Sequence, residues 1–375
     1  MSRRVLHLFA NWKWTGPAEP AVLLASEQAR RGDAVTFVPG RAPPGCDAQI
    51  AAEARAHGLD VREGPRLPKH RRPLANLLDR GPLRAIVAEV RPDVVHVHST
   101  NDHLAGVRAV GAAGSRALVV RSYYDADPPA GGSAAPFRRR TDGVVVFGRA
   151  AETALAERLG PRRVLRADPP TARRFLVDPP AGLPDPRGRW GLAPEDCAVG
   201  IVARVQTHRR WDLLLDAFER AARERPELRL VIIGRGTRFD ELARGPSDRG
   251  GLRGRVVLAG YLRGDDYLGA LHALDAKVFL VPGSDGTCRA AREAMACGVP
   301  VVATRRGLLP EIVADGETGL LIDETPAALA AALVRLAADR ELRSALGSAA
   351  GRTARARFDP ERYASAVDGF YGHVS

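Results

Sequence analysis

Residues 277–303, KVFLVPGSDGTCRAAREAMACGVPVVA, contain two short apolar runs that are separated by a glycine-containing turn and a helical pattern. Runs rich in Val, Leu and Phe are typical of strands that are buried on both faces of a sheet. We expect strands over 277–281 and 299–303, joined by a helix over 288–296. This order of elements favours a parallel sheet with helices on its faces.

Short apolar runs and helical patterns alternate along most of the chain. We expect further strands over residues 5–9, 34–38, 94–98, 118–120, 144–147, 199–203, 228–233, 256–259 and 319–322. We expect helices over residues 19–31, 74–90, 102–111, 150–159, 210–223, 265–274, 326–338 and 340–358. The sequence therefore predicts an α/β fold with Rossmann-like, doubly wound sheets.

A proline-rich stretch interrupts this alternation at residues 167–196. Proline continues neither a helix nor a central strand, so we expect a linker here. The chain has 375 residues, which also favours two domains. We expect domains over 1–175 and 190–358 that face an interdomain cleft, because such folds bind ligands at the carboxyl ends of their strands.

The composition is typical of a soluble globular protein, with 45% hydrophobic and 27% charged residues. No stretch approaches the ~20 apolar residues that a membrane span needs. The start of the chain, MSRRVLHLFANW, holds too short an apolar run for a signal peptide and is predicted to form a strand. Cys46, Cys197, Cys288 and Cys297 form no C-x-x-C pair. We therefore expect a cytoplasmic protein without a disulfide framework or a zinc site.

The net charge is +12, and most of the positive residues are arginines. The arginines could reflect a GC-rich coding sequence and be spread over solvated faces, or they could bind an acidic partner. The clusters at 66–72 (RLPKHRR) and 138–140 (RRR) are candidates for contact with an anionic membrane surface. Neither cluster has interleaved aromatic residues or lies on a recognisable nucleic-acid module, so nucleic acid is not an expected partner.

The turn after the strand at 277–281 combines two acids and a glycine around the start of a helix. In one interpretation Asp285 caps the helix, and Glu293 lies on its exposed face and pairs with Arg289. In the other, the helix start binds a phosphate and the two carboxylates accept hydrogen bonds from hydroxyls. Gly286 would let such a ligand approach the backbone closely.

The longer string DGTCRAAREAMACGVPVVATRRGLLPEIVADGETGLL, residues 285–321, resembles the donor-binding signature of the family 4 glycosyltransferases, which have the GT-B fold. A match of this length is far more specific than a single glycine motif. Further segments that resemble the family are TGPAEPAVLLASEQARRGDAVTFV (15–38), RPDVVHVHSTNDHLAG (91–106), VARVQTHRRWDLLLDAF (202–218), LRLVIIGRG (228–236) and FDPERYASAVDGFYG (358–372).

The resemblance implies roles for the matching residues in binding a nucleotide-diphosphate sugar. Asp285 would contact hydroxyls of the donor sugar, and Glu293 would contact those of the ribose. Arg204 and Arg209 would bind the diphosphate through charge-assisted hydrogen bonds. The other implied site residues are Gly286, Thr287, Cys288 and Arg289 through their backbone, Gly16 near the phosphates or the acceptor, and Gly260 and Tyr261 near the nucleobase.

The resemblance also implies an activity, that of a retaining glycosyltransferase that needs neither a metal nor a cofactor. Arginines and a helix start would stabilise the charge that develops on the departing nucleoside diphosphate. The acceptor would be a hydroxyl of a lipid-linked, polysaccharide or small-molecule substrate, and residues 359–375 would pack back on the first domain. Two alternatives stay open: a sugar-nucleotide epimerase of the same fold, and a non-catalytic basic protein that binds anionic lipid or nucleic acid.

The sequence departs from the family pattern at the first acid and at a histidine. The first acid is Asp285 instead of the usual Glu. In VRSYYD, residues 120–125, Tyr124 stands where family members often have a histidine, and it could line the sugar site or only pack. His98 is a further candidate at the cleft. The triplet 125–127 is an Asp-x-Asp like that of metal-dependent transferases of another fold, but the two-domain pattern does not favour that fold, and no metal is expected.

Overall fold

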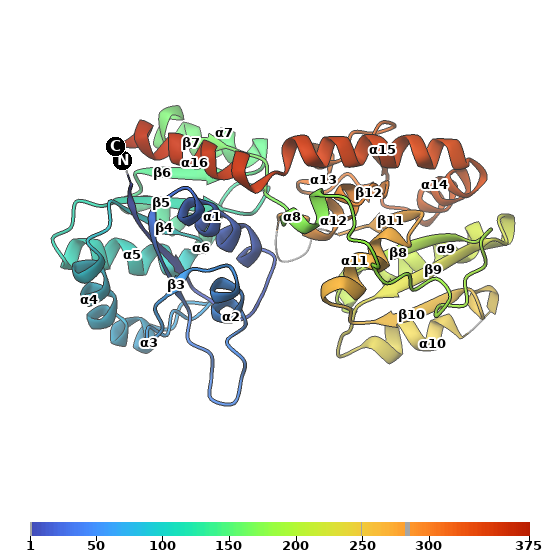
Figure 1. Ribbon diagram of the computed structural model, residues 1–375, viewed down its shortest axis with the longest axis horizontal. Helices are drawn as coiled ribbons and strands as arrows, with labels where there is room; N and C mark the ends of the chain where they lie inside the picture. Colours follow the sequence, from blue (N-terminus) through green and yellow to red (C-terminus); the bar gives the residue numbers. More distant parts are fainter. Residues whose placement is uncertain (1, 249, 282–285) are drawn as a thin grey trace. The chain divides into compact units, whose positions relative to one another are not determined.

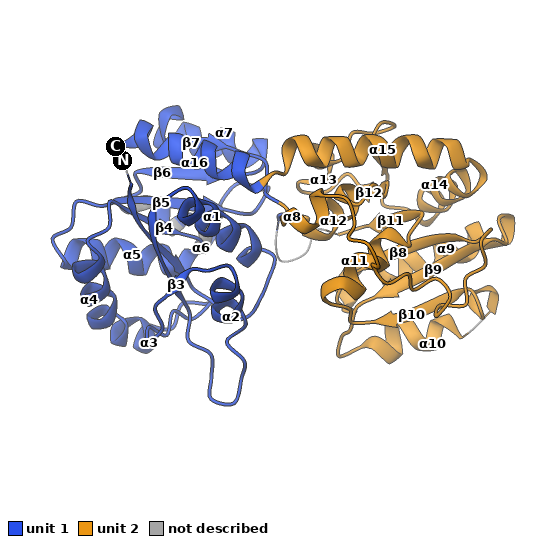
Figure 2. Ribbon diagram, viewed as in Figure 1, with its two compact units in different colours: residues 1–170, 285–287, 360–375 blue, residues 171–284, 288–359 orange. Residues whose placement is uncertain are grey.

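In the computed structural model, which describes residues 2–248, 250–281 and 286–375, the chain divides into two α/β units (Figures 1 and 2). Unit 1 holds residues 2–170, 286–287 and 360–375, and unit 2 holds the described residues of 171–281 and 288–359. In the described parts of the chain, no helix has both the length and the apolar character needed to cross a membrane.

Unit 1 is built on a parallel seven-stranded sheet with the strand order β3-β2-β1-β4-β5-β6-β7. Its strands are β1 (Arg4–Phe9), β2 (Ala34–Pro39), β3 (Asp60–Val61), β4 (Val94–Val97), β5 (Leu118–Tyr123), β6 (Gly143–Val146) and β7 (Val164–Arg166). Its helices are α1 (Ala18–Arg30), α2 (Gln49–Ala56), α3 (Pro73–Leu78), α4 (Arg80–Val90), α5 (Thr100–Ala112), α6 (Gly131–Ala134), α7 (Arg149–Leu159) and α16 (Pro360–Val374).

The C-terminal helix α16 packs on unit 1, beside α1 (Figure 1). It also contacts β6, where a Cβ atom built on Gly143 would lie 2.7 Å from the Phe370 ring. A glycine in this strand therefore leaves the space that the Phe370 side chain fills. This packing places the polar residues of α16 against the middle of the sheet.

Unit 2 is built on a parallel six-stranded sheet with the strand order β10-β9-β8-β11-β12-β13. Its strands are β8 (Cys197–Val202), β9 (Leu228–Ile233), β10 (Val256–Gly260), β11 (Ala276–Phe279), β12 (Val301–Thr304) and β13 (Gly319–Ile322). Its helices are α8 (Arg173–Leu176), α9 (Trp211–Glu224), α10 (Gly245–Ser247), α11 (Gly264–His272), α12 (Arg289–Ala296), α13 (Leu309–Ile312), α14 (Pro326–Ala338) and α15 (Arg340–Arg357).

The predicted fold class is confirmed, since both units have a parallel sheet flanked by helices. One expected helix, over residues 74–90, is instead two helices, α3 and α4, that meet at Asp79. The Asp79 carboxylate is buried and accepts hydrogen bonds from the backbone N–H groups of Arg66 and Leu67, at 2.7 and 2.8 Å. The Asp79 side chain therefore stabilises the loop that precedes α3.

Candidate functional site

Several of the residues that the sequence singles out lie around the start of α12. Asp285 lies outside the described residues, which resume at Gly286. Thr287 and Cys288 are fully buried, and Cys288 adopts a left-handed backbone conformation with φ 49° and ψ 40° directly before α12. This sharp turn sets the direction in which α12 begins.

Glu293 of α12 is a buried carboxylate, with only 3% of its surface exposed. The Tyr267 hydroxyl on α11 donates a hydrogen bond to its Oε2 atom at 2.6 Å, and the Nε atom of Arg289 lies 3.6 Å from its Oε1 atom. Burial and the nearby carboxylate raise the pKa of Tyr267 well above its usual value. The ion pair with Arg289 therefore forms, but the interpretation that Glu293 lies on an exposed helix face is wrong.

Lys277 of β11 is a buried residue that sequence reasoning did not select. It is fully buried, and its Nζ atom has no hydrogen-bond partner among the described residues. The ammonium lies 4.7 Å from the centre of the Phe279 ring. Burial lowers the pKa of Lys277 to about 7, while the Glu293 carboxylate acts in the opposite direction. The signal in the sequence was a lysine at the start of an otherwise apolar run, KVFLV.

The two arginines expected at the diphosphate lie in the segment that follows β8. Arg204 is exposed, and the Nη1 atom of Arg209 donates a hydrogen bond to the carbonyl oxygen of Val281 at 3.0 Å. Val281 follows β11, and β11 pairs with β8. Both arginines therefore follow the carboxyl end of one strand, and Arg209 reaches the end of its neighbour.

Two glycines after β9 hold the Arg204 segment closely. A Cβ atom on Gly234 would lie 2.0 Å from the Ala203 carbonyl oxygen, and one on Gly236 would lie 2.1 Å from the Val205 carbonyl oxygen. Gly234 also has φ +155°, which other residues rarely adopt. The pair Gly234 and Gly236 is therefore explained by backbone packing next to Arg204.

Gly260 ends β10 and Tyr261 follows it, and both contact the loop that follows β9. The Gly260 carbonyl accepts a hydrogen bond from the N–H of Gly234 at 2.7 Å. The Tyr261 ring is half-exposed, and the guanidinium carbons of Arg235 and Arg263 lie 4.4 and 4.9 Å from its centre. Guanidinium groups over an exposed aromatic ring give a planar, positively charged surface that can stack on a planar, electron-rich group.

In unit 1, Tyr124 and His98 follow the carboxyl ends of β5 and β4. Both are buried, and the Tyr124 hydroxyl lies 2.6 Å from the Nδ1 atom of His98. A Cβ atom on Gly286, which belongs to unit 1, would lie 2.3 Å from the Tyr124 carbonyl oxygen. Gly16 is buried in the turn between β1 and α1. Unit 1 therefore brings Gly286, Tyr124 and His98 together, and Gly16 follows the carboxyl end of β1 in the same sheet.

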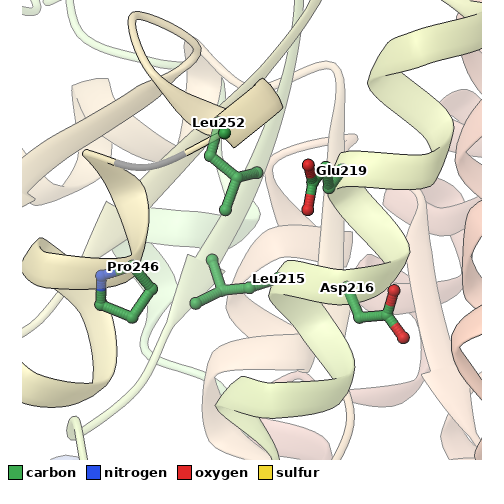
Figure 3. Close-up of a pocket in the computed structure, with 6 residues that line it drawn as sticks. Leu215, Asp216, Glu219, Pro246 and Leu252 are labelled. Carbon is green, nitrogen blue, oxygen red and sulfur yellow. The ribbon is translucent and has the colours of Figure 1, made fainter.

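Two cavities lie apart from these residues. Figure 3 shows one of about 310 Å³, where α9 faces the segment around α10; its lining residues are Leu215, Asp216, Glu219, Pro246, Gly250 and Leu252. Glu219 there pairs with Arg223 at 3.0 Å. Another cavity, of about 770 Å³, lies at the amino ends of β1 and β4. No group of three or more His, Cys, Asp or Glu among the described residues is placed to hold a metal ion.

Comparison with protein families gives two matches that together cover most of the chain. Residues 16–170 match the model of Glycosyltransferase Family 4, and residues 186–353 match that of the group 1 glycosyl transferases. Curated relatives include the GDP-mannose-dependent alpha-(1-6)-phosphatidylinositol monomannoside mannosyltransferase of Mycolicibacterium smegmatis, 35% identical over 219 residues, which are 56% of each protein. Another is the D-inositol 3-phosphate glycosyltransferase of Streptomyces avermitilis, 36% identical over 47% of this chain and 40% of that protein. The chain thus spans about half the length of the curated relatives it matches.

Solved structures share the fold over nearly the whole chain. Anabaena HepE in complex with UDP superposes with a TM-score of 0.81 at 19% identity, covering 98% of this chain and 99% of that one. A glycosyltransferase from Rickettsia africae gives a TM-score of 0.81 at 13% identity and covers 100% and 99%. The fold of this chain is thus that of known glycosyltransferases.

Proposed function

We propose that this chain, which belongs to the family 4 glycosyltransferases and has their GT-B fold, moves a sugar from a nucleotide-diphosphate sugar to an acceptor hydroxyl. The observation that carries the proposal is the grouping of Arg209, the start of α12 and Glu293 at one edge of the unit 2 sheet. In this proposal the domain over 190–358 binds the donor and the domain over 1–175 binds the acceptor.

The diphosphate of the donor would lie against Arg204, Arg209 and the backbone N–H groups of residues 286–289. Guanidinium groups and the N-terminus of a helix both favour phosphate oxygens, through charge-assisted hydrogen bonds and through the helix dipole. Arg209 is supported by its bond to the Val281 carbonyl, which aims the side chain at the end of β11. Gly16 would approach the phosphates or the acceptor from unit 1.

The nucleoside would be held by Glu293 and Tyr261. An ionised carboxylate accepts two hydroxyl hydrogen bonds well, and Tyr267 already holds the Glu293 side chain in one orientation. The half-exposed Tyr261 ring and the guanidinium groups of Arg235 and Arg263 that lie over it would face the base. Asp285 would contact the sugar itself.

Catalysis would come from stabilising charge that grows as the sugar–phosphate bond breaks. Arg209 and a helix start that are held in place before the reaction, together with Arg204, would stabilise a leaving diphosphate more than they stabilise the bound substrate. This arrangement supplies positive charge without a metal, and we propose that the anomeric configuration is retained. His98 and Tyr124 would lie at the reaction centre on the unit 1 side.

We further propose that unit 1 contacts an anionic membrane surface through α3 and the arginines beside it. Leu74, Leu77 and Leu78 of α3 are exposed by 70%, 53% and 47%. Burial and then the nearby positive charges of Arg80, Arg71 and Arg139 lower the pKa of Arg108, so these arginines form a like-charged cluster. Exposed leucines next to clustered arginines fit the interface of an anionic bilayer.

A product assay tests the transferase proposal. The purified chain would be incubated with UDP- and GDP-sugars in EDTA, after a thermal-shift screen has selected the donors that raise the melting temperature. We expect release of the nucleoside diphosphate together with a new glycoside of α configuration from an α-linked donor. Formation of only an isomerised nucleotide sugar would favour the epimerase alternative, and activity that required Mn²⁺ or Mg²⁺ would contradict metal independence.

A further inference from the structure

Three histidine rings stack inside unit 1, between the sheet and the helices α1 and α16. His7 lies on β1, His96 lies beside it on β4, and His98 follows β4. The ring centres are 5.3 Å apart for His7 and His96, 5.3 Å for His7 and His98, and 4.7 Å for His96 and His98. All three are buried. Buried polar groups need hydrogen-bond partners, so the partners of these rings decide where each ring carries its hydrogen.

One carboxylate fixes the direction of the first bond. Asp368 of α16 pairs with Arg31, whose Nε atom is 3.3 Å away, and accepts a hydrogen bond from Nε2 of Gln28 at 2.8 Å. An ionised carboxylate can only accept, so the amide nitrogen of Gln28 must face Asp368 and its Oε1 atom must face His7. Nε2 of His7 lies 2.8 Å from that oxygen. His7 therefore carries its hydrogen on Nε2.

The hydrogen-bond direction at His98 then follows from the tautomer of His7. Burial lowers the pKa of His7 to about 4 and that of His98 well below its usual value, so both rings are neutral at physiological pH. A neutral imidazole has one donor and one acceptor. Nδ1 of His7 thus accepts from Nε2 of His98 at 3.0 Å, and Nδ1 of His98 accepts from the Tyr124 hydroxyl at 2.6 Å.

A second branch from Gln28 gives His96 the same tautomer. Nε2 of Gln28 also donates to the Tyr371 hydroxyl at 3.3 Å, which leaves the hydrogen of Tyr371 for Nδ1 of His96. Nε2 of His96 then donates to the Ser122 hydroxyl at 2.8 Å. Both branches are satisfied with one orientation of Gln28, which supports the assignment.

We propose that Asp368 and Gln28 are positioning residues that act through His7 and His98 to fix Tyr124 as a hydrogen-bond donor to His98. The hydroxyl hydrogen of Tyr124 is committed to His98, so Tyr124 has none to donate to a phosphate oxygen or to another substrate group. The use of these bonds in catalysis rests on the proposed function.

The backbone of Tyr124 lies against Gly286 of unit 1, since its carbonyl oxygen would lie 2.3 Å from a Cβ atom on that glycine. The relay, defined as Asp368, Gln28, His7, His98 and Tyr124, thus connects α16 with the residue that follows β5.

The tautomers can be measured without any substrate. Nitrogen NMR of the full chain with ¹⁵N-labelled histidine would be recorded at pH 7, and single His7→Asn, His96→Asn and His98→Asn variants would assign the three rings among the nine histidines. We expect all three rings to be neutral with the hydrogen on Nε2. A hydrogen on Nδ1 of His98, or a cationic His98, would overturn the relay whether or not the chain transfers sugar.

Kinetics of two variants of Gln28 test whether the reaction uses the relay. Gln28→Met removes both functions of the amide, whereas a protonated Gln28→Glu side chain can still accept from His7 and donate to Asp368. We expect Gln28→Met and Tyr124→Phe to lower kcat about fivefold to tenfold, the effect of one net hydrogen bond, with the donor KM within about twofold of wild type. Gln28→Glu should restore most of kcat and the Nε2 tautomer of His98.

Two results would overturn the use of the relay in catalysis. One is a Tyr124→Phe variant with the wild-type kcat, and the other is a Gln28→Glu variant no better than Gln28→Met. If Gln28→Met does not fold, Tyr124→Phe and the wild-type tautomers still decide the matter. If no donor is turned over, the proposed function fails, while the NMR result still decides the relay.

Discussion

The Tyr267 hydroxyl on α11 donates a hydrogen bond to Oε2 of Glu293 on α12 over 2.6 Å. This bond ties together two helices that follow different strands of the unit 2 sheet, and it holds a buried carboxylate in one orientation at the edge of that sheet. If Glu293 binds the ribose, Tyr267 orients the Glu293 carboxylate. Substitution of Tyr267 should then lower activity less than substitution of Glu293.

We expect Glu293→Gln to lower kcat/KM by about a hundredfold, because hydrogen bonds from hydroxyls to a carboxylate are charge-assisted. Tyr267→Phe should raise the donor KM about fivefold to tenfold with little change in kcat, since only the orientation of Glu293 is lost. Steady-state kinetics and circular dichroism would be compared with Glu241→Gln, an exposed acid paired with Arg238. Wild-type kinetics in folded Glu293→Gln would contradict the assignment of Glu293.

Lys277 should make the stability of unit 2 depend on pH. Its pKa is lowered to about 7 in the folded chain from an ordinary value of 10.5, so between these pH values the unfolded chain binds more protons. The cost of burying the amine is therefore fully present below pH 7 and is relieved as the pH rises toward 10.5. Lys277→Met should stabilise the chain most at pH 6.5, and the gain should shrink by pH 9.

Urea unfolding at several pH values measures this effect, followed through tryptophan fluorescence, to which the buried Trp211 of unit 2 contributes. The matched control is Lys13→Met, which changes an exposed lysine of unit 1. A stabilisation by Lys277→Met that did not vary with pH would show that Lys277 is not a buried neutral amine near pH 8.

The glycine pair after β9 should be needed for donor binding. In Gly236→Ala the new Cβ atom would lie 2.1 Å from the Val205 carbonyl oxygen, so the segment that carries Arg204 must shift. We expect donor affinity to fall about tenfold, the effect of displacing one charge-assisted phosphate contact. Gly81→Ala, on an open face of α4, is the control because nothing lies within 4 Å of its Cβ position. Equal donor affinity in the Gly236→Ala and Gly81→Ala variants would contradict the claim that Gly234 and Gly236 are needed for donor binding.

Specific membrane contact through α3 can be distinguished from nonspecific adsorption to vesicles. We expect the chain to sediment with vesicles that contain phosphatidylglycerol at low salt and much less with purely phosphatidylcholine vesicles. Leu74→Ser combined with Leu77→Ser should weaken this binding about tenfold, because two exposed apolar side chains are lost. Val177→Ser, which changes an apolar residue of unit 2 that is 57% exposed, should leave it unchanged. Equal sedimentation with both kinds of vesicle would contradict the proposal.

The fold could be predicted because its strands are buried on both faces and therefore appear as continuous apolar runs. The prediction was weakest where polar residues are buried. The strand expected over 118–120 is Leu118–Tyr123, because Arg121 and Ser122 are buried too; Ser122 bonds to His96, and Arg121 lies near Thr100 and His103. A hydropathy pattern ends the strand at such polar residues. In the fold they remain in the strand, because groups on other elements form hydrogen bonds with them.

The candidate site could be predicted only along two stretches of the chain that resemble the family pattern. These are the signature from Gly286 to Glu293 and the segment that holds the arginines at 204 and 209. Tyr267 and Lys277 could not be predicted, because their connection to Glu293 exists only after α11 and β11 have packed beside α12. Gln28 and Asp368 are 340 positions apart in the sequence, so no local pattern could reveal their hydrogen bond.

The central claim is that arginines at the carboxyl edge of unit 2 bind the diphosphate of the donor, and calorimetric titration of UDP and GDP in EDTA tests it most directly. We predict that one of these nucleotides binds the wild-type chain, and that Arg209→Met weakens its binding at least about tenfold. Arg220→Met, which removes an exposed arginine paired with Asp216 on α9, should leave the affinity unchanged. The same affinity in the Arg209→Met and Arg220→Met variants would contradict the account.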